Sequence, residues 1–460
     1  GRGNGITLGG VVIIDAKGNP IGRVVGIFPP DLPTGECCAH SSLFPKYMIY
    51  DPAGNRGQIV VEGRLTNLHI ENNRIRDMGL CGIGPVGFFD VRNHLEVVTV
   101  NGLFIVQNEI TACPNRAITE LTKDQSAFMG YGAISLPDVA GLVVRDNQIR
   151  NTGETLKDPV CGIFVLHGEQ VEISRNQILD LRDWTTADVK SFSGYRAGIC
   201  IAMVTPPAAT SDLIYYLENF IKHDPGVRQT RSAYLGDVPA LVVQENVVKV
   251  PIGLALAVNG LGAYSIQGNQ FATGGTVKSE GFALAASVLI FNFGTPVEKP
   301  RPVTKAADLI GILLAGKAEG LDFQSMFITS QIDSIVGSVA PGPVLFSQNR
   351  CSLDLAANQA KAFTSVFIAT ADDIGFHDNQ TWVRTPAIKS DNYKNIQVLC
   401  DVFLIGITVR ATCNRFQEPL RSVYFSNLTL GIFNIATLNI ASNKMFAVLP
   451  SLLTMGDIIL

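Results

Sequence analysis

The chain has 460 residues, of which 47% are hydrophobic and only 17% are charged. Its formal net charge of −4, with both signs interspersed, argues against nucleic acid or an anionic membrane surface as the partner. No run of 18 or more apolar residues occurs, so we expect no membrane-spanning helix. A chain of this length usually divides into several domains, but a solenoid lengthens its core without thickening it.

The first 60 residues are the least regular part of the sequence. Strand-like segments at Ile6–Leu8 and Val11–Ile14 are followed by a proline-rich stretch from Pro29 to Pro45. We expect residues 1–60 to form an N-terminal cap or irregular first coils. The chain opens without Met and closes within an apolar stretch, so we also expect it to be a piece of a longer protein.

From residue 61 onward a short pattern recurs: two apolar residues with one residue between them, then Asn three positions later, then an apolar residue two positions after the Asn. Leu68 to Ile75, Leu103 to Ile110 and Leu142 to Ile149 are three copies. The recurring asparagines are Asn73, Asn108, Asn147, Asn176, Asn219, Asn246, Asn269, Asn349, Asn379, Asn414 and Asn443, and at Asn379 the last apolar residue is replaced by Thr381. Successive copies lie 23 to 43 residues apart, except for an interval of 80 after Asn269. This interval has room for two further rungs without the Asn, through Phe282–Ala285 and Ser325–Ile328.

The alternation of apolar residues has period 2, which predicts short strands, and the Asn then marks a corner. Asn tolerates the left-handed conformation, and its amide can bond backbone groups that a bend leaves unpaired. Stacked corners would form an internal asparagine ladder. An earlier strand is expected in each rung, as at Gly132–Leu136, Gly162–Leu166, Gly198–Ala202 and Gly253–Ala257, followed by a short turn such as Pro137–Gly141.

This pattern, over about residues 60 to 445, resembles the right-handed parallel β-helix repeats of the pectin-lyase-like superfamily. The resemblance implies an all-β right-handed solenoid over residues 61–460, with roughly twelve rungs and an inner Asn ladder at the corner after the second strand. Relatives in this superfamily bind polysaccharide in a groove beside the first-strand sheet.

The long, variable segments are expected after the third strand of each rung, where they would form a wall beside that groove. The candidate binding residues on this wall are Arg182, Trp184, Tyr195, Arg196, His223, Arg228, Arg231 and Tyr234. Aromatic faces beside planar polar groups suit a glycan. A protein-docking surface and an ordinary solvated face are the alternatives.

Catalysis is not favoured by the sequence. The Gly-His-Gly and Arg-Ile-Lys motifs of polygalacturonase-like hydrolases are missing, and Asp372-Asp373 precedes a second strand instead of lying in the groove. The predicted first strands are apolar, whereas pectate-lyase-like enzymes need clustered carboxylates for Ca²⁺. The six His residues show no metal-site spacing, so we predict no catalytic residue, no metal site and no cofactor.

Nine cysteines sit mostly between apolar neighbours and are expected to pack as free thiols. Asn379-Gln-Thr matches a glycosylation acceptor, but a ladder Asn would point inward.

The sequence therefore predicts a non-catalytic structural or binding module of a larger bacterial or phage-tail-like surface assembly, extracellular or associated with a cell or particle surface. Its partners would be other domains or subunits, or polysaccharide. The alternative is a polysaccharide lyase or glycoside hydrolase, and a homotrimeric fibre is a third option, which predicts an apolar stripe along one outer sheet.

Overall fold

The structure is a computed structural model, and the residues that it describes are all strand, bend or connection, without a helix. These residues are 3–8, 11–14, 20–24, 63–85, 98–115, 131–153, 160–181, 196–205, 239–275, 284–292, 341–354, 362–384, 398–417, 428–446 and 452–455. Within these ranges no helix could cross a membrane.

The strands repeat in a fixed order, so that each coil of the chain contributes a first, a second and a third strand. First strands standing alone are β1 (Ile6–Leu8), β6 (Ile83–Pro85), β13 (Ala197–Thr205), β16 (Leu254–Gly260), β19 (Leu284–Asn292), β22 (Ala362–Thr370) and β29 (Leu452–Met455). Second strands standing alone are β4 (Gly63–Glu71), β7 (Val98–Val106), β14 (Leu241–Gln244), β17 (Gly262–Gln267), β20 (Pro341–Ser347) and β23 (Ile374–His377). Four long strands combine both: β9 (Tyr131–Arg145), β11 (Val160–Ser174), β25 (Val398–Thr412) and β27 (Leu428–Ala441).

The third strands form a separate sheet of ten strands among the described residues. They are β5 (Arg74–Arg76), β8 (Glu109–Thr111), β10 (Gln148–Arg150), β12 (Gln177–Leu179), β15 (Val247–Val250), β18 (Gln270–Thr273), β21 (Arg350–Asp354), β24 (Gln380–Arg384), β26 (Arg415–Gln417) and β28 (Lys444–Phe446). Each pairs in parallel with the third strand of the next coil, as when Ile149 on β10 aligns with Ile178 on β12.

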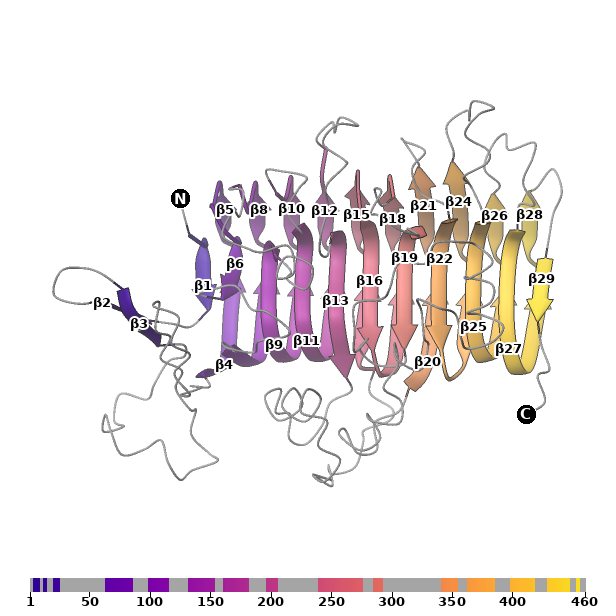
Figure 1. Cartoon of the computed structure of the whole chain (residues 1–460), viewed down its shortest axis with the longest axis horizontal. Coiled ribbons are helices and arrows are strands. Elements are labelled where there is room, and N and C mark those ends of the chain that lie inside the picture. The colour runs from indigo at the N-terminus through magenta and orange to yellow at the C-terminus, as the bar shows by residue number, and fades with distance from the viewer. Residues whose placement is uncertain are drawn as a thin grey trace, which may run out of the picture.

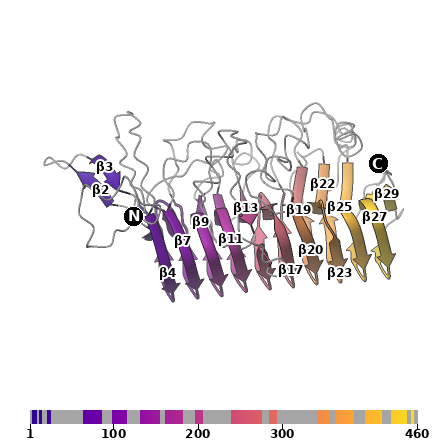
Figure 2. The same ribbon diagram turned by 90° about the horizontal axis from the view of Figure 1, so that it is seen from below.

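Equivalent strands of successive coils lie side by side along the long axis of the molecule (Figures 1 and 2). All pairings between these coils are parallel; for example, Ile134 on β9 aligns with Ile163 on β11, and Val144 aligns with Ile173. Parallel strands that return to the same sheet after every turn of the chain are the arrangement of a solenoid-like β-helix, as the sequence predicts.

The predicted turn at Pro137–Gly141 is instead part of the continuous strand β9. Val139 pairs with Gly168 of β11 and is buried in the core, so the backbone keeps its ladder of hydrogen bonds through this segment. The change of direction comes from one residue, Gly141, whose φ is +66°. The equivalent Gln170 in β11 has φ +54°.

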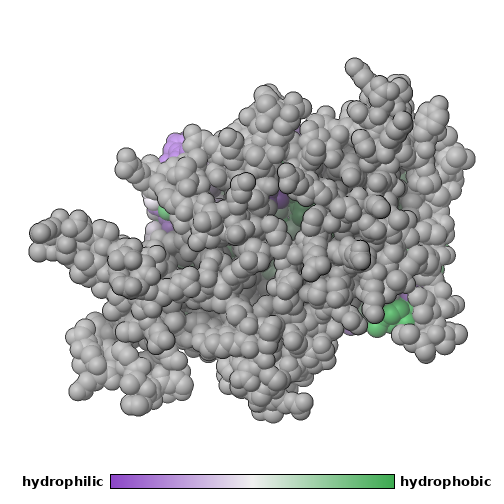
Figure 3. Space-filling view, viewed as in Figure 1, coloured by the Kyte–Doolittle hydropathy of each residue, from purple (hydrophilic) through white to green (hydrophobic). Residues whose placement is uncertain are grey.

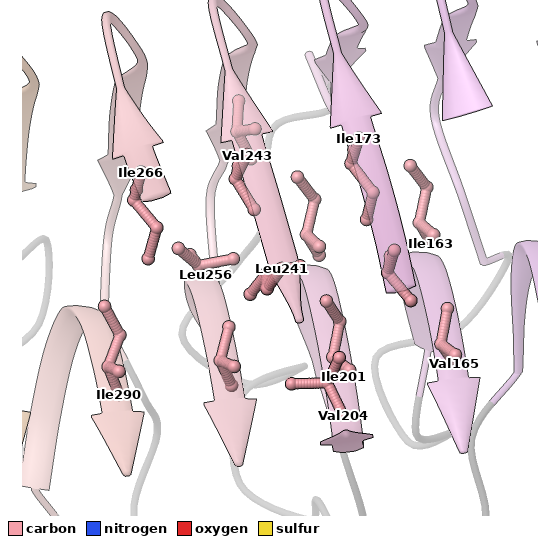
Figure 4. Close-up of a cluster of buried hydrophobic side chains, with 14 of the residues drawn as sticks. Ile163, Val165, Ile173, Ile201, Val204, Leu241, Val243, Leu256, Ile266 and Ile290 are labelled. Atoms are coloured by element: carbon pink, nitrogen blue, oxygen red, sulfur yellow. The ribbon is translucent and has the colours of Figure 1, made fainter. Parts of the chain in front are cut away.

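Inward-pointing aliphatic side chains of all three strand series fill the interior. Figure 4 shows part of this core, in which Ile163 and Val165 on β11 lie beside Ile201 on β13 and Leu256 on β16. These four side chains are fully shielded from solvent. Each coil buries its apolar face only against its neighbours, so burial is favourable only when the coils stack.

The two additional rungs expected between Asn269 and Asn349 do not exist at the level of the second and third strands. β17 pairs directly with β20, and β18 pairs directly with β21. The described residue Leu284 begins the first strand of the coil that contains Asn349. Ser325, which the sequence also suggested as part of a rung, lies outside the described residues.

At the N-terminal end, β1 pairs with β6 and so joins the first-strand series. β2 (Val11–Ile14) pairs with β3 (Pro20–Val24) in an antiparallel hairpin. The expected domain boundary near residue 60 lies outside the described residues and remains a prediction.

Candidate functional site

The corner between the second and third strands is occupied by an asparagine in each described coil, and this residue is buried except at the two ends of the series, where Asn73 and Asn443 are partly buried. The side-chain Nδ2 of each one donates to the Oδ1 of the next, at distances of 2.9 to 3.3 Å. The series runs through Asn73, Asn108, Asn147, Asn176, Asn246, Asn269, Asn349, Asn379, Asn414 and Asn443.

Each amide in this series also holds the backbone. The Nδ2 of Asn147 donates to the carbonyl of Ile105 in the preceding coil at 2.8 Å, and its backbone N–H donates to the Oδ1 of Asn176 at 3.0 Å. The asparagines therefore satisfy backbone groups that a sharp bend would leave unpaired in an apolar interior, where an unpaired group is costly.

Asn219 has no place in this series, although it matches the repeat. It lies outside the described residues, and Asn176 contacts Asn246 directly, with an Nδ2 to Oδ1 distance of 3.0 Å. The third strand β12 also pairs directly with β15, so no coil can stand between them.

The left-handed residue of the corner is the one before each asparagine, whereas we expected the asparagine itself. Ten such residues have φ between +53° and +67°: Asn72, Gln107, Asp146, Arg175, Glu245, Gly268, Gln348, Asp378, Cys413 and Ser442. The asparagine stays in ordinary conformation because its amide must point inward, and the residue before it makes the bend.

The outward face of the first-strand sheet carries two apolar clusters that are separate from the interior core. One gathers Phe164, Cys161 and Cys200 on β11 and β13. The other gathers Phe367, Ala369, Cys400 and Phe403 on β22 and β25. Strand register places Phe164, Cys200, Ala257, Leu289, Phe367 and Phe403 in a single row across these coils.

In the second cluster, four phenylalanines contact one another in sequence. The ring centroids are 5.3 Å apart for Phe291–Phe367, 5.6 Å for Phe367–Phe403 and 5.2 Å for Phe403–Phe433. Phe367 and Phe403 are buried within the single chain. The row therefore has the apolar composition of the stripe that a homotrimer would need. It is not exposed, however, so it does not offer a surface for subunit contacts.

Two exposed isoleucines, Ile407 and Ile435, lie within β25 and β27. Figure 3 shows one compact green patch toward the lower right of the face that it presents. Two side chains are far smaller than the apolar patches that mark protein interfaces.

Of the predicted wall residues, only Arg196 is described. It immediately precedes β13, and its backbone carbonyl accepts from the N–H of Leu254 at 3.1 Å. Arg182, Trp184, Tyr195, His223, Arg228, Arg231 and Tyr234 lie outside the described residues.

Strand order nevertheless divides these residues between two connections. Arg182, Trp184 and Tyr195 fall between the third strand β12 and the first strand β13. His223, Arg228, Arg231 and Tyr234 fall between the first strand β13 and the second strand β14. The sequence placed all of them after third strands because Asn219 was taken as a corner; the second group instead enters from the opposite end of the first strand.

The acidic pair Asp372-Asp373 lies between β22 and β23, at the approach to a second strand. The Oδ1 of Asp372 accepts from the backbone N–H of Asp373 at 2.7 Å, and the Asp372 carbonyl accepts from Ile407 at 3.0 Å. These contacts give the pair a turn-forming role. Among the described residues no group of three or more His, Cys, Asp or Glu is arranged to hold a metal ion.

The described histidine and cysteine side chains pack against other side chains or form hydrogen bonds within the fold. His69 stacks on Phe104 with centroids 4.6 Å apart, and His377 Nδ1 lies 2.7 Å from Thr412 Oγ1. Seven described cysteines are free, and all but Cys413 are buried. Burial raises the pKa of the Cys81 and Cys113 thiols to about 11, so both are inert at neutral pH.

The sequence did not predict one buried polar cluster, which lies inside the coil around Asp401 on β25. The Oδ2 of Asp401 accepts from Thr381 Oγ1 at 2.7 Å, and Ser365 Oγ lies within hydrogen-bond distance of both Oδ1 and the backbone carbonyl of Asp401. Thr381 occupies the interior third-strand position where its neighbours place Cys351 and Phe416. The replacement of an apolar residue by Thr381 was the one sequence signal for this cluster.

Comparison of the chain with protein-family models, with curated proteins and with solved structures finds no match in any of the three.

Proposed function

We propose that the chain is a right-handed parallel β-helix of the pectin-lyase-like class that works as a rigid, non-catalytic binding module in a larger surface assembly. A right-handed path is the general rule for connections between parallel strands of one sheet. The stacked asparagines and the apolar interior support a stiff coil, because every described corner is held to its neighbours by side-chain and backbone hydrogen bonds.

The observation that carries the non-catalytic part of the proposal is the outward row of the first strands. In the superfamily that the chain resembles, catalytic carboxylates or calcium ligands project from this face. Here the row holds Phe164, Cys200, Ala257, Phe367 and Phe403. Aromatic and small apolar side chains can neither transfer a proton to a glycosidic oxygen nor coordinate Ca²⁺.

Binding then falls to the connections that flank the first strands, since segments on a rigid scaffold commonly carry recognition. The partner is a polysaccharide or another protein subunit of an extracellular or particle-bound assembly. Because strand order separates the wall residues into two groups, one at each end of β13, the partner is expected to use one group and not both.

A glycan panel tests both parts of the proposal. Binding is measured on an array of acidic and neutral polysaccharides, and turnover is measured by release of reducing ends and of unsaturated products. We expect no turnover on any glycan. Turnover that is lost in Asp372→Asn/Asp373→Asn but kept in the control Asp378→Asn would establish the enzyme alternative, and turnover in all three proteins would equally overturn the proposal.

Two sets of alanine variants assign the binding edge. One set changes Arg182, Trp184 and Tyr195, and the other changes His223, Arg228, Arg231 and Tyr234. We expect at least a tenfold loss of affinity for a glycan or subunit in one set and unchanged affinity in the other. If both sets kept the affinity of the unchanged protein, the flanking connections would not be the binding site. A trimer mass in solution would favour the fibre alternative.

A further inference from the structure

We propose that Asp401 is a proton-linked latch inside the coil, which ties the first strands β22 and β25 together more firmly in mildly acidic than in alkaline solution. The inference is independent of what the chain binds. It rests on the contacts of one carboxyl group that lies wholly within the solenoid.

The number of protons available to Ser365 is the first argument. A hydroxyl group has one proton to donate. Ser365 Oγ nevertheless contacts two oxygen atoms of Asp401, the backbone carbonyl at 2.7 Å and the carboxyl Oδ1 at a shorter distance. A single proton can serve both acceptors only as a shared, three-centre hydrogen bond, whereas a second proton allows two separate bonds. A neutral Asp401 supplies it: the carboxyl O–H donates to Ser365 Oγ, and the Ser365 hydroxyl donates to the Asp401 carbonyl.

The second argument is the surroundings of the carboxyl group, taken element by element. On β22 the facing groups are the hydroxyls of Thr364 and Ser365, and Thr364 Oγ1 lies 3.0 Å from the Val366 carbonyl and 3.2 Å from the Asp401 carbonyl. On β24 the facing group is the Thr381 hydroxyl. The titratable neighbours are the Cys351 thiol on β21 and the Cys400 thiol on β25. Within the described residues these groups are hydroxyls and thiols, and none of them is a cation.

On the other side, strand register aligns Asp401 with Thr429 of β27, since Cys400 pairs with Leu428 and Val402 pairs with Leu430. Thr429 is buried, and its Oγ1 has no hydrogen-bond partner. Thr429 is uncharged, so the described part of β27 places no cation opposite the carboxyl group.

Burial raises the pKa of Asp401 from its ordinary value of 3.8 to about 7, although the hydroxyls of Ser365 and Thr381 oppose the rise. Because the pKa is higher in the folded chain than in the unfolded chain, folding takes up a proton between about pH 4 and pH 7. The stabilisation is therefore complete below about pH 4 and is lost as the pH rises through about 7.

Asp401→Asn is the sharpest test, because the Asn amide keeps the shape of the carboxyl group and stays neutral. Its Nδ2 can donate to Ser365 Oγ while its Oδ1 accepts from Thr381. One linked proton changes the folding equilibrium by up to about tenfold per pH unit inside this window. We expect wild-type stability, measured as urea midpoints from pH 5 to 9, to decline relative to Asp401→Asn, and the variant to be the more stable protein at pH 9.

The control is Asp378→Asn, which changes an exposed acid at the corner between β23 and β24. It should keep the wild-type pH profile. Amide hydrogen exchange, corrected for intrinsic rates, should show the loss of protection at high pH first in β22, β25 and β27, whereas β9 and β11 should stay protected.

An infrared measurement of the wild-type chain keeps the test independent of whether the variant folds. A buried carboxylic acid has a C=O stretching band that disappears when it ionises. We expect that band at pH 6 and its loss by pH 9. A fully ionised Asp401 at pH 6, or an Asp401→Asn profile parallel to that of the wild type, would overturn the latch.

Discussion

The amide of Asn176 donates to the Oδ1 of Asn246 across 3.0 Å, although 70 residues separate the two along the chain. Asn176 is fully buried, and its Nδ2 also reaches the carbonyls of Val144 and Ser174. One side chain thus joins three coils, so a change at this position should be felt well beyond its own corner.

Replacing Asn176 by Ala should lower the free energy of unfolding by about 3 kcal/mol, because the side-chain amide of Asn147 and three backbone groups (the Asn147 N–H and the Val144 and Ser174 carbonyls) lose a buried partner. Urea unfolding followed by circular dichroism measures the effect. Asn439→Ala is the matched control, since Asn439 is an exposed asparagine of β27 outside the series, and it should cost less than about 0.5 kcal/mol. Equal losses in the two variants would contradict this account of the corner.

The left-handed corner residues offer a test of backbone strain. Gln348 is exposed and has φ +57°, so Gln348→Gly should stabilise the chain by up to about 1 kcal/mol, after the greater freedom of glycine in the unfolded chain is subtracted. Gly268 has φ +67°, and an added Cβ would meet only ordinary contacts, so Gly268→Ala should destabilise by about 1 kcal/mol through conformation alone. Thermal melts of both variants test whether their stability changes have opposite signs. Gln348→Ala is the control for loss of the Gln348 side chain.

The outward phenylalanine row should contribute to stability as a core does. Phe367 is buried between Phe291 and Phe403, so Phe367→Ala should cost about 3 kcal/mol. Leu345 is outward and exposed on a second strand, and Leu345→Ala should cost less than about 1 kcal/mol. Similar midpoints for the two variants would show that the row is not packed within the single chain.

Arg175 should set the ionisation of Asp146. Its guanidinium donates to both carboxylate oxygens, at 2.8 and 3.0 Å, and this hydrogen bonding lowers the pKa of Asp146. The lowered pKa means that the pair stabilises the chain above the ordinary pKa of Asp and loses its effect as the pH falls. The pair is largely exposed, so Arg175→Gln should leave the thermal midpoint nearly unchanged while returning the Asp146 pKa toward its ordinary value, as followed by carbon NMR of the carboxyl group.

Thiol reactivity should separate the described cysteines into two classes. Cys413 is exposed, whereas Cys81 and Cys113 are buried with pKa values raised to about 11. Iodoacetamide at pH 7.5, mapped by peptide mass, should modify Cys413 long before these two. Rapid labelling of Cys81 in the folded chain would contradict the packing of the first coils.

Local features of the sequence were enough to predict short strands, inward apolar side chains and an asparagine at most of the corners. The reason is physical: a corner buried between stacked coils leaves the same backbone groups unpaired each time. An Asn side chain at that corner can form hydrogen bonds with these groups, so the local sequence repeats. Asn108, Asn147 and Asn269 could therefore be recognised from their immediate neighbours. The preceding residue could not be identified as the left-handed one, because Gln107, Arg175 and Cys413 have nothing in common except their position.

Long-range contacts decided the rest. Only stacking shows that Asn176 adjoins Asn246, and that Asn269 adjoins Asn349 across 80 residues without any coil between them. The same strand order puts His223 between the first strand β13 and the second strand β14, and not after a third strand. It also brings Asp401, Ser365 and Thr381 together from three different strands. No local sequence pattern predicts these contacts, since each of these residues contacts partners from another turn of the chain.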